Sequence, residues 1–147
     1  MTNQNDFFRL CDKVGQRTPL WVQGAGGNIS QKMTVDGREI LRIKASGYRL
    51  DHINSSQGYV DLDLKETSLK LETLRSASDR ESAYAKLLSE SVVNRSQPGE
   101  RASMETCFHL ALEAPLVVHF HSLPAVLLAD AYFKNEKRVL EFLNKPG

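Results

Sequence analysis

The run ASMETCFHLALEAPLVVHFHS, residues 102–122, constrains the fold more than any other part of the chain. Ser103 can begin a helix, and the proline at position 115 stops one by Glu113, because proline cannot continue a helix and disfavours it in the residue before. The apolar run LVVHFH that follows is typical of a strand. The sequence therefore predicts a helix over 103–113, a short turn and a returning strand over 116–121.

Two histidines lie at the end of this strand, separated by one phenylalanine. Side chains two apart on a strand point to the same face, about 6.5–7 Å from each other along the chain. His119 and His121 therefore share a face, while Val118 and Phe120 face the opposite way. Two imidazoles at this spacing can bind one metal ion, with bonds of about 2.0–2.1 Å. They can equally be polar residues at a strand end.

Glu105 favours the metal interpretation. The helix rises about 15 Å at 1.5 Å per residue, and the strand runs back about 15–20 Å. The strand end thus returns to the level of the helix start, which brings His119 and His121 beside Glu105. A carboxylate with two imidazoles is a ligand set that leaves positions open for water or substrate. Taken alone, Glu105 would simply complement the helix dipole.

Three other residues whose side chains could take part in chemistry are interpreted mainly as structural. His109 lies four residues after Glu105 on the same helix face. It could join the metal site, but a place behind the ligands or in the core is favoured. Cys107 points away from Glu105, and we expect a small buried hydrophobic side chain there. His52 is interpreted as a loop residue without a role.

The stretch QGAGGNIS contains Gly24, Gly26 and Gly27. It is neither a Walker loop nor a dinucleotide fingerprint, because the required lysine and third glycine are absent. It is either a tight β-turn or an anion cradle, in which backbone N–H groups and the Asn28 amide act as donors.

Two further turns offer hydroxyl groups. The stretch KASG, residues 44–47, places Ser46 beside Gly47 after a strand, and Ser103 lies at a helix N-terminus, which favours anions. The three places are candidate phosphate contacts. Lys44 also admits a Schiff-base role, but nothing near it in the sequence would lower its pKa.

The remaining pattern alternates strands and helices. We expect a helix over 6–15, a strand-like run over 18–22 and a second short strand after the glycine turn. Further strands are expected over 38–46 and 58–64, and helices over 79–94, 124–132 and 135–144, with a loop over 95–102. The fold class is therefore α/β or α+β, with helices covering a sheet.

Charge and cysteine content exclude several classes of function. A net charge of +1 provides no field that would attract nucleic acid or a membrane surface. Two cysteines are too few for a disulfide scaffold and indicate a reducing compartment. No apolar run approaches the roughly 20 residues that span a bilayer, and no secretory signal is visible. We expect one cytoplasmic domain over residues 1–147.

In order, the motifs GAGGNIS, KASGYRL, ASMETCFH and VVHFHS resemble those of the class II aldolase/adducin family, over roughly residues 5–132. The resemblance implies a three-layer α/β/α fold and a divalent ion, usually zinc. It implies a small phosphorylated sugar or ketose as substrate, with reversible C–C cleavage by way of an enediolate. It also implies a homo-oligomer with active sites at subunit contacts.

The resemblance assigns roles to individual residues. Glu105 would be the catalytic acid/base group, and His119 and His121 would be metal ligands. The phosphate would be bound by Gly27, Asn28, Ser46, Gly47 and Ser103.

Two departures leave alternatives open. The family's proline before the serine is Ala102 here, and the family's third metal-binding histidine has no counterpart after His121. Either the domain is incomplete at its C-terminus, or the site is degenerate and the domain is a non-catalytic, adducin-like interaction module. A sugar-phosphate epimerase or dehydratase of the same family would share all four motifs.

Overall fold

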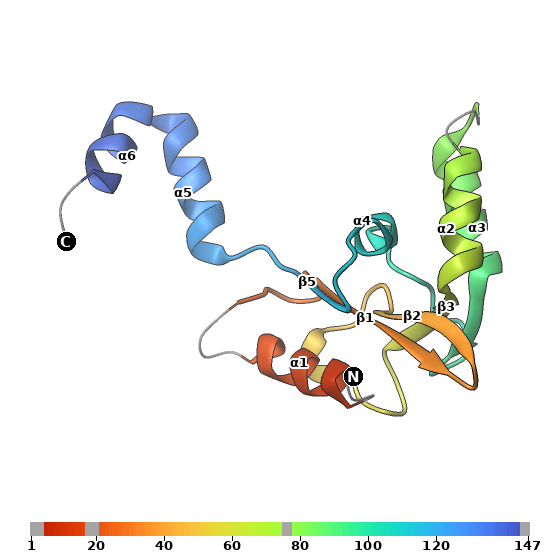
Figure 1. Cartoon of the computed structure of the whole chain (residues 1–147). Helices are drawn as coiled ribbons and strands as arrows, with labels where there is room; N and C mark the ends of the chain where they lie inside the picture. The colour runs from red at the N-terminus through yellow and green to blue at the C-terminus, as the bar shows by residue number, and fades with distance from the viewer. Residues whose placement is uncertain (1–4, 17–20, 75–77, 145–147) are drawn as a thin grey trace.

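Five antiparallel strands form one sheet in the order β4-β3-β2-β1-β5 (Figure 1). The computed structural model describes residues 5–16, 21–74 and 78–144. The strands are β1 (Asn28–Val35), β2 (Arg38–Lys44), β3 (Tyr59–Asp63), β4 (Val92–Arg95) and β5 (Leu116–His119). Strand β1 lies between β2 and β5, so the glycine turn that precedes it lies beside the end of the histidine strand.

The β1–β2 hairpin is set by a two-residue turn. Asp36 and Gly37 both have positive φ, 50° and 78°, as a type I′ turn requires. This turn matches the twist of paired strands, and Asp-Gly is one of its preferred sequences. Val35 therefore pairs with Arg38, and the ladder continues to Ser30 opposite Ile43.

Six α-helices and a short 3-10 helix, η1 (Leu50–His52), accompany the sheet in the described residues. The α-helices are α1 (Asp6–Gly15), α2 (Leu64–Thr73), α3 (Arg80–Ser91), α4 (Thr106–Ala111), α5 (Leu123–Lys134) and α6 (Glu136–Leu143). Asp63, Asp79, Ser122 and Asn135 begin four of them by accepting a hydrogen bond from a backbone N–H three residues later. Such N-caps satisfy donors that the helix itself leaves free.

Helices cover both faces of the sheet. On one face α1 and η1 bury Phe7, Leu50 and their neighbours against Ile29 and Tyr59. On the other face the α3 residues Leu87 and Leu88 pack on the strand residues Ile43, Val60 and Leu62. These two apolar layers confirm the expected three-layer α/β/α arrangement.

The helices α5 and α6 form an arm that stands away from the sheet (Figure 1). They pack on each other, but α5 has no buried residue. Leu127 and Phe133 are 59% and 88% exposed. The arm therefore differs from α1 and α3, whose apolar side chains lie against the sheet. None of the helices in the described ranges is long and apolar enough to cross a bilayer.

The structure departs from the sequence-based expectations in several elements. Helix α2 was not predicted, and the helix expected over 79–94 ends at Ser91, because residues 92–95 pair with β3 instead. Trp21 and Val22 are not in a strand, and residues 18–20 of that expected strand lie outside the described residues. The helix expected over 103–113 spans only 106–111, and β5 ends at His119 rather than at 121.

Candidate metal centre

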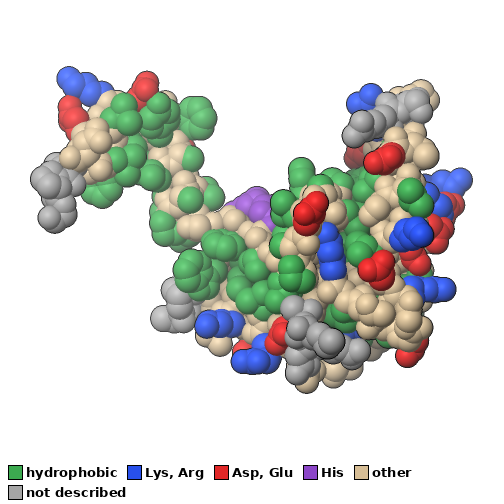
Figure 2. Space-filling model, viewed as in Figure 1, with side chains coloured by type: hydrophobic (Ala, Val, Ile, Leu, Met, Phe, Trp, Pro, Cys, Tyr) green, Lys and Arg blue, Asp and Glu red, His purple; other side chains and the backbone are tan. Residues whose placement is uncertain are grey.

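The end of β5 and the start of α4 bring Glu105, His119 and His121 together. Nδ1 of His119 lies 3.2 Å from Oε1 of Glu105, and Nε2 of His119 lies 3.0 Å from Nε2 of His121. His121 reaches the group although it follows the strand. Figure 2 shows histidine surface at the base of the arm, between the arm and the sheet.

The donor atoms of this group fit one divalent ion. One ligand atom from each residue lies within 4.8 Å of the other two. Two atoms bound to the same ion at about 2.1 Å can be at most about 4.2 Å apart. The three donor atoms are therefore near the spacing of one coordination shell, and the half-exposed side chains leave room for the rotation that would complete it. Imidazole nitrogens with a carboxylate oxygen suit zinc and related ions.

Glu105 has a partner for each of its oxygens. Oε1 faces His119, and Oε2 accepts a hydrogen bond of 3.4 Å from the side-chain amide of Asn28. With Nδ1 of His119 turned to the carboxylate, its Nε2 is the nitrogen that faces His121 and would face an ion. A carboxylate that holds the second nitrogen of a metal-binding histidine is a recurrent arrangement around protein metals.

Gly27 joins the glycine turn to the histidine strand. Its φ is +72°, and a Cβ at this position would lie 2.8 Å from the Val22 side chain and 3.0 Å from the carbonyl oxygen of His119. Asn28, the next residue, is buried and pairs with His119 across the β1–β5 ladder. Only glycine fits here, so the turn and the candidate metal centre are one packed unit.

The second expected phosphate turn lies beside the segment that carries Ser103. The N–H of Ser46 donates to the carbonyl of Arg101 at 2.9 Å, and Ala45 pairs with Ala102. The Ser46 amide is therefore already used, which leaves its exposed hydroxyl as a donor. Gly47, at φ +85°, has open space where a side chain would lie.

Contacts connect most of the residues that the sequence assigns to phosphate. Asn28 bonds to the Glu105 side chain, and Ser103 Oγ accepts from the Glu105 N–H at 3.3 Å. Ser46 bonds to Arg101, two residues before Ser103. The N–H groups of Gly27 and Gly47 have no acceptor within residues 5–16, 21–74 and 78–144. Phosphate binding by this set stays a prediction.

Sequence reasoning missed the part that Lys44 plays. The side chain is 3% exposed, and Nζ donates to the carbonyl oxygens of Ala25 and Tyr48, at 3.1 and 2.9 Å. Burial lowers its pKa, and the charge of Glu105 acts in the opposite direction. Lys44 therefore ties the two glycine turns together and places an ammonium group behind them. No local signal reveals this, because its acceptors come from distant loops.

His109 is buried beside the centre and is not among its three ligand residues. Its Nδ1 lies 2.7 Å from the hydroxyl of Ser30, while Nε2 has no partner within the described residues. Burial lowers the pKa of His109 to about 4, the charge of Glu105 opposes the shift, and the charges of His119 and Lys32 add to it. The imidazole is therefore neutral at physiological pH.

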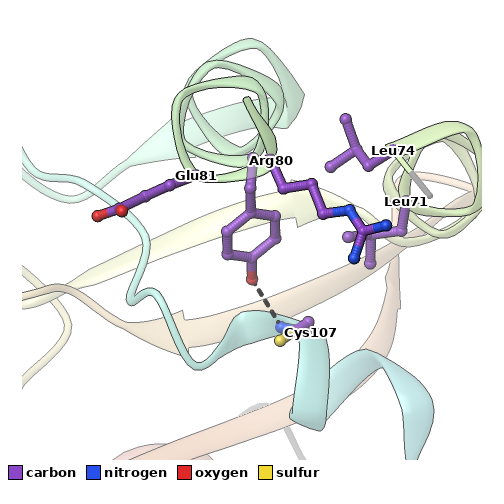
Figure 3. A pocket seen from close by; sticks show the side chains of 6 residues that line it. Leu71, Leu74, Arg80, Glu81 and Cys107 are labelled. Carbon is purple, nitrogen blue, oxygen red and sulfur yellow. Dashed lines mark hydrogen bonds between the residues drawn. The ribbon is translucent and has the colours of Figure 1, made fainter. Parts of the chain in front are cut away.

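Cys107 is half-exposed, contrary to the expectation of a buried side chain. It lines a cavity of about 650 Å³ between α2, α3 and α4, with Leu71, Leu74 and Tyr84 among the walls (Figure 3). The Cys107 N–H donates to the hydroxyl of Tyr84 at 2.8 Å. The thiol is exposed because α4 is short and does not pack closely against α2 and α3 at this point.

A second hollow lies next to the centre. Its volume is about 450 Å³, and it is bounded by Phe108 and Leu112 of the α4 segment, by Phe120 and by the two rings of His109 and His119. The walls are mainly apolar, so the metal centre opens on one side to a surface that suits hydrocarbon rather than charge.

Comparisons with known proteins agree with this architecture. The family model described as "Class II Aldolase and Adducin N-terminal domain" matches residues 5–144. A solved structure of the N-terminal class II aldolase domain of a conserved protein from Thermoplasma acidophilum is similar, with 27% identity and a TM-score of 0.64. The match covers 88% of this chain and 66% of that one, just under two thirds of its length. No curated protein matches the chain.

Proposed function

We propose that this chain, which belongs to the class II aldolase and adducin family, acts as a metal-dependent lyase of the aldolase type. Its substrate would be a small phosphorylated sugar or ketose, cleaved reversibly at a C–C bond by way of an enediolate. The observation that carries this proposal is the convergence of Glu105, His119 and His121 on one point. Family membership by itself does not distinguish an aldolase from an epimerase or a dehydratase with the same residues.

The roles follow from the contacts. Nε2 of His119 and Nε2 of His121 would hold the ion, zinc in the first instance. A bound divalent ion supplies a Lewis acid that stabilises negative charge on substrate oxygens. Glu105, which contacts Asn28 and His119, would act beside the ion as the acid/base group that moves a proton between substrate carbon and solvent. The carboxylate would also orient the His119 ring through its contact with Nδ1.

The phosphate would lie over the two glycine turns. The N–H groups of Gly27 and Gly47 and the hydroxyls of Ser46 and Ser103 are the donors that the surrounding contacts leave available. Their attraction for an anion is increased by the buried ammonium of Lys44. The substrate would thus extend from these turns to the metal centre, with Asn28 between the two ends.

A second function, a non-catalytic interaction domain, is favoured by one observation. The arm presents apolar side chains along α5 that nothing in the described residues covers, such as Leu127 and Phe133. Exposed apolar surface of this kind is typical of contacts between proteins. Association through the arm is compatible with catalysis, so the metal centre decides between the two functions.

Zinc titration by calorimetry tests the proposal. We expect wild-type protein to bind one zinc ion per chain. His119→Ala or His121→Ala should weaken binding more than the roughly 10–100-fold caused by loss of an outer hydrogen-bond partner. Binding should weaken between pH 7 and pH 5, because protons compete for the imidazole nitrogens.

His52→Ala is the matched control, since His52 is an exposed histidine of η1, which packs on α1, and its ring lies 4.0 Å from Asp51. It should leave zinc binding unchanged. Equal affinity in the wild type and in His121→Ala would refute the metal centre and with it the lyase. Zinc binding without aldol cleavage, epimerisation or dehydration of any phosphorylated sugar would favour the interaction domain.

A further inference from the structure

Helix α4, which follows Glu105, has little apolar attachment to the domain. Its six residues include no side-chain cap, and the apolar side chains in and around it point outward. Met104, Phe108 and Leu112 are 49%, 66% and 52% exposed. The residues that α4 buries are Thr106 and His109. What fixes α4, and therefore Glu105, has to be polar.

Hydrogen bonds to β1 supply this attachment. Asn28 and Ser30, two apart on β1, point to the same face, and Glu105 and His109, four apart, lie on the same side of the α4 segment. Asn28 reaches Glu105 at 3.4 Å, whereas Ser30 reaches His109 at 2.7 Å in buried surroundings. The contact between Ser30 and His109 is thus the shorter and the more buried of the two.

The other ties of this segment act elsewhere. Lys32, also on β1, donates from a partly exposed position to the carbonyl oxygens of Leu110 and Leu112 at the far end of α4. The Tyr84 hydroxyl accepts from the Cys107 N–H at the cavity between α2, α3 and α4 (Figure 3). The His109–Ser30 contact is thus the buried tie on the side of α4 that faces β1 and the metal centre.

We infer that His109, held by Ser30, is a positioning residue that acts through Glu105 and thereby orients His119 for metal binding. The inference rests on the proposed metal centre and adds two residues to it. The rigid connection is one turn of helix, from His109 back to Glu105. Displacement of α4 would lengthen the contact of 3.2 Å between Glu105 and Nδ1 of His119. It would free that ring to rotate away from His121.

Zinc calorimetry on a set of variants tests this inference. His109→Leu fills the same space without the hydrogen bond and should weaken zinc binding about tenfold or more, as loss of an outer-shell partner does. His109→Asn keeps a polar atom near the position of Nδ1 and should restore most of the affinity. Ser30→Ala, the smaller change, should reproduce the loss, and the double variant His109→Leu with Ser30→Ala should lose no more.

The decisive experiment repeats His109→Leu in a Glu105→Gln background. If His109 acts through Glu105, the substitution should there change zinc affinity less than about twofold. Tyr84→Phe is the control, because it removes a polar tie between α3 and α4 that does not involve β1, and it should lower the melting temperature without changing zinc affinity.

The outcomes separate the two proposals. An equal loss in both backgrounds, or an unchanged affinity in Ser30→Ala, would overturn the positioning role and leave the metal centre standing. Equal zinc affinity in the wild type and in His121→Ala would overturn the metal centre itself, and the positioning role with it.

Discussion

The Arg42–Asp61 pair and the Glu105–His119–His121 group both lie on the sheet, one on the β2–β3 ladder and the other at the end of β5. Arg42 donates two hydrogen bonds to the two Asp61 oxygens, at 2.8 and 2.9 Å, and Asn94 donates a third at 3.1 Å. The guanidinium also lies 4.3 Å from the centre of the Tyr59 ring. The two charged side chains are 12% and 5% exposed.

The second group is looser in every respect. Glu105 and His119 are about one-third exposed, His121 is exposed, and the contacts among the three residues are single. A buried charge needs all its hydrogen-bonding atoms satisfied by the protein, because no water compensates. A metal-binding group needs the reverse, with donor atoms aimed at a point that no protein atom fills. The difference separates a structural ionic cluster from a functional one on the same sheet.

Breaking the buried Arg42–Asp61 pair should give the largest effect on stability. Arg42→Met leaves Asp61 buried and without its counter-charge, so we expect a loss of about 3–5 kcal/mol in the free energy of unfolding. Zinc affinity of the folded variant should stay within about twofold of the wild type, because the pair makes no contact with the centre. Urea unfolding and zinc calorimetry measure the two quantities.

Arg38→Met is the matched control for that substitution. Arg38 is on the same strand, and its contact with Asp63 is longer, 3.7 Å, and more exposed. Removal of such a surface pair should cost less than about 1 kcal/mol. If Arg42→Met cost no more than Arg38→Met, the pair would not be the structural element that its burial indicates.

His109 combines features of both regions. It lies beside the Glu105–His119–His121 group, but it is buried like the Arg42–Asp61 pair. Its pKa in the folded protein is about 4, below the value near 6.5 of an unfolded chain. The neutral ring therefore contributes its full stability above pH 6.5, and this is lost as the pH falls from 6.5 to about 4. The change amounts to roughly 3 kcal/mol.

The measurement compares unfolding free energies at pH 7, 5.5 and 4.5 in metal-free protein. His109→Asn cannot take up this proton, so its stability should fall less over the same interval. Parallel curves for the wild type and the variant would show that the protonation of His109 does not contribute to the acid destabilisation.

The sequence predicts the candidate centre better than it predicts the helices around it. The meeting of Glu105 with the two histidines follows from two fixed rises, that of a helix and that of a strand, and it survives a helix that is shorter than expected. Four motifs in family order also indicate the fold correctly. These inferences need only distances along the chain.

What the sequence does not show depends on contacts between distant segments. Residues 92–95 continue a helical pattern locally, but pairing with β3 makes them a strand. Asp63 fits the alternation of β3, and its second role as the N-cap of α2 went unrecognised. Lys44 gives no local sign of its two carbonyl partners, nor does His109 of Ser30. In each case the deciding partner lies in another loop or strand.

The smallest effect is expected for His121→Ala in metal-free protein. The side chain is exposed, and within the described residues its ring contacts that of His119, so the free energy of unfolding should change by less than about 0.5 kcal/mol. Zinc at about 100 times its dissociation constant should then stabilise the wild type by about 2.7 kcal/mol, and the variant by much less. Thermal unfolding with and without zinc shows both differences. The pattern is the reverse of that for Arg42→Met, where stability falls and zinc affinity is kept. A large loss in metal-free His121→Ala, with zinc stabilising both proteins alike, would mean that the histidine pair serves the fold rather than an ion.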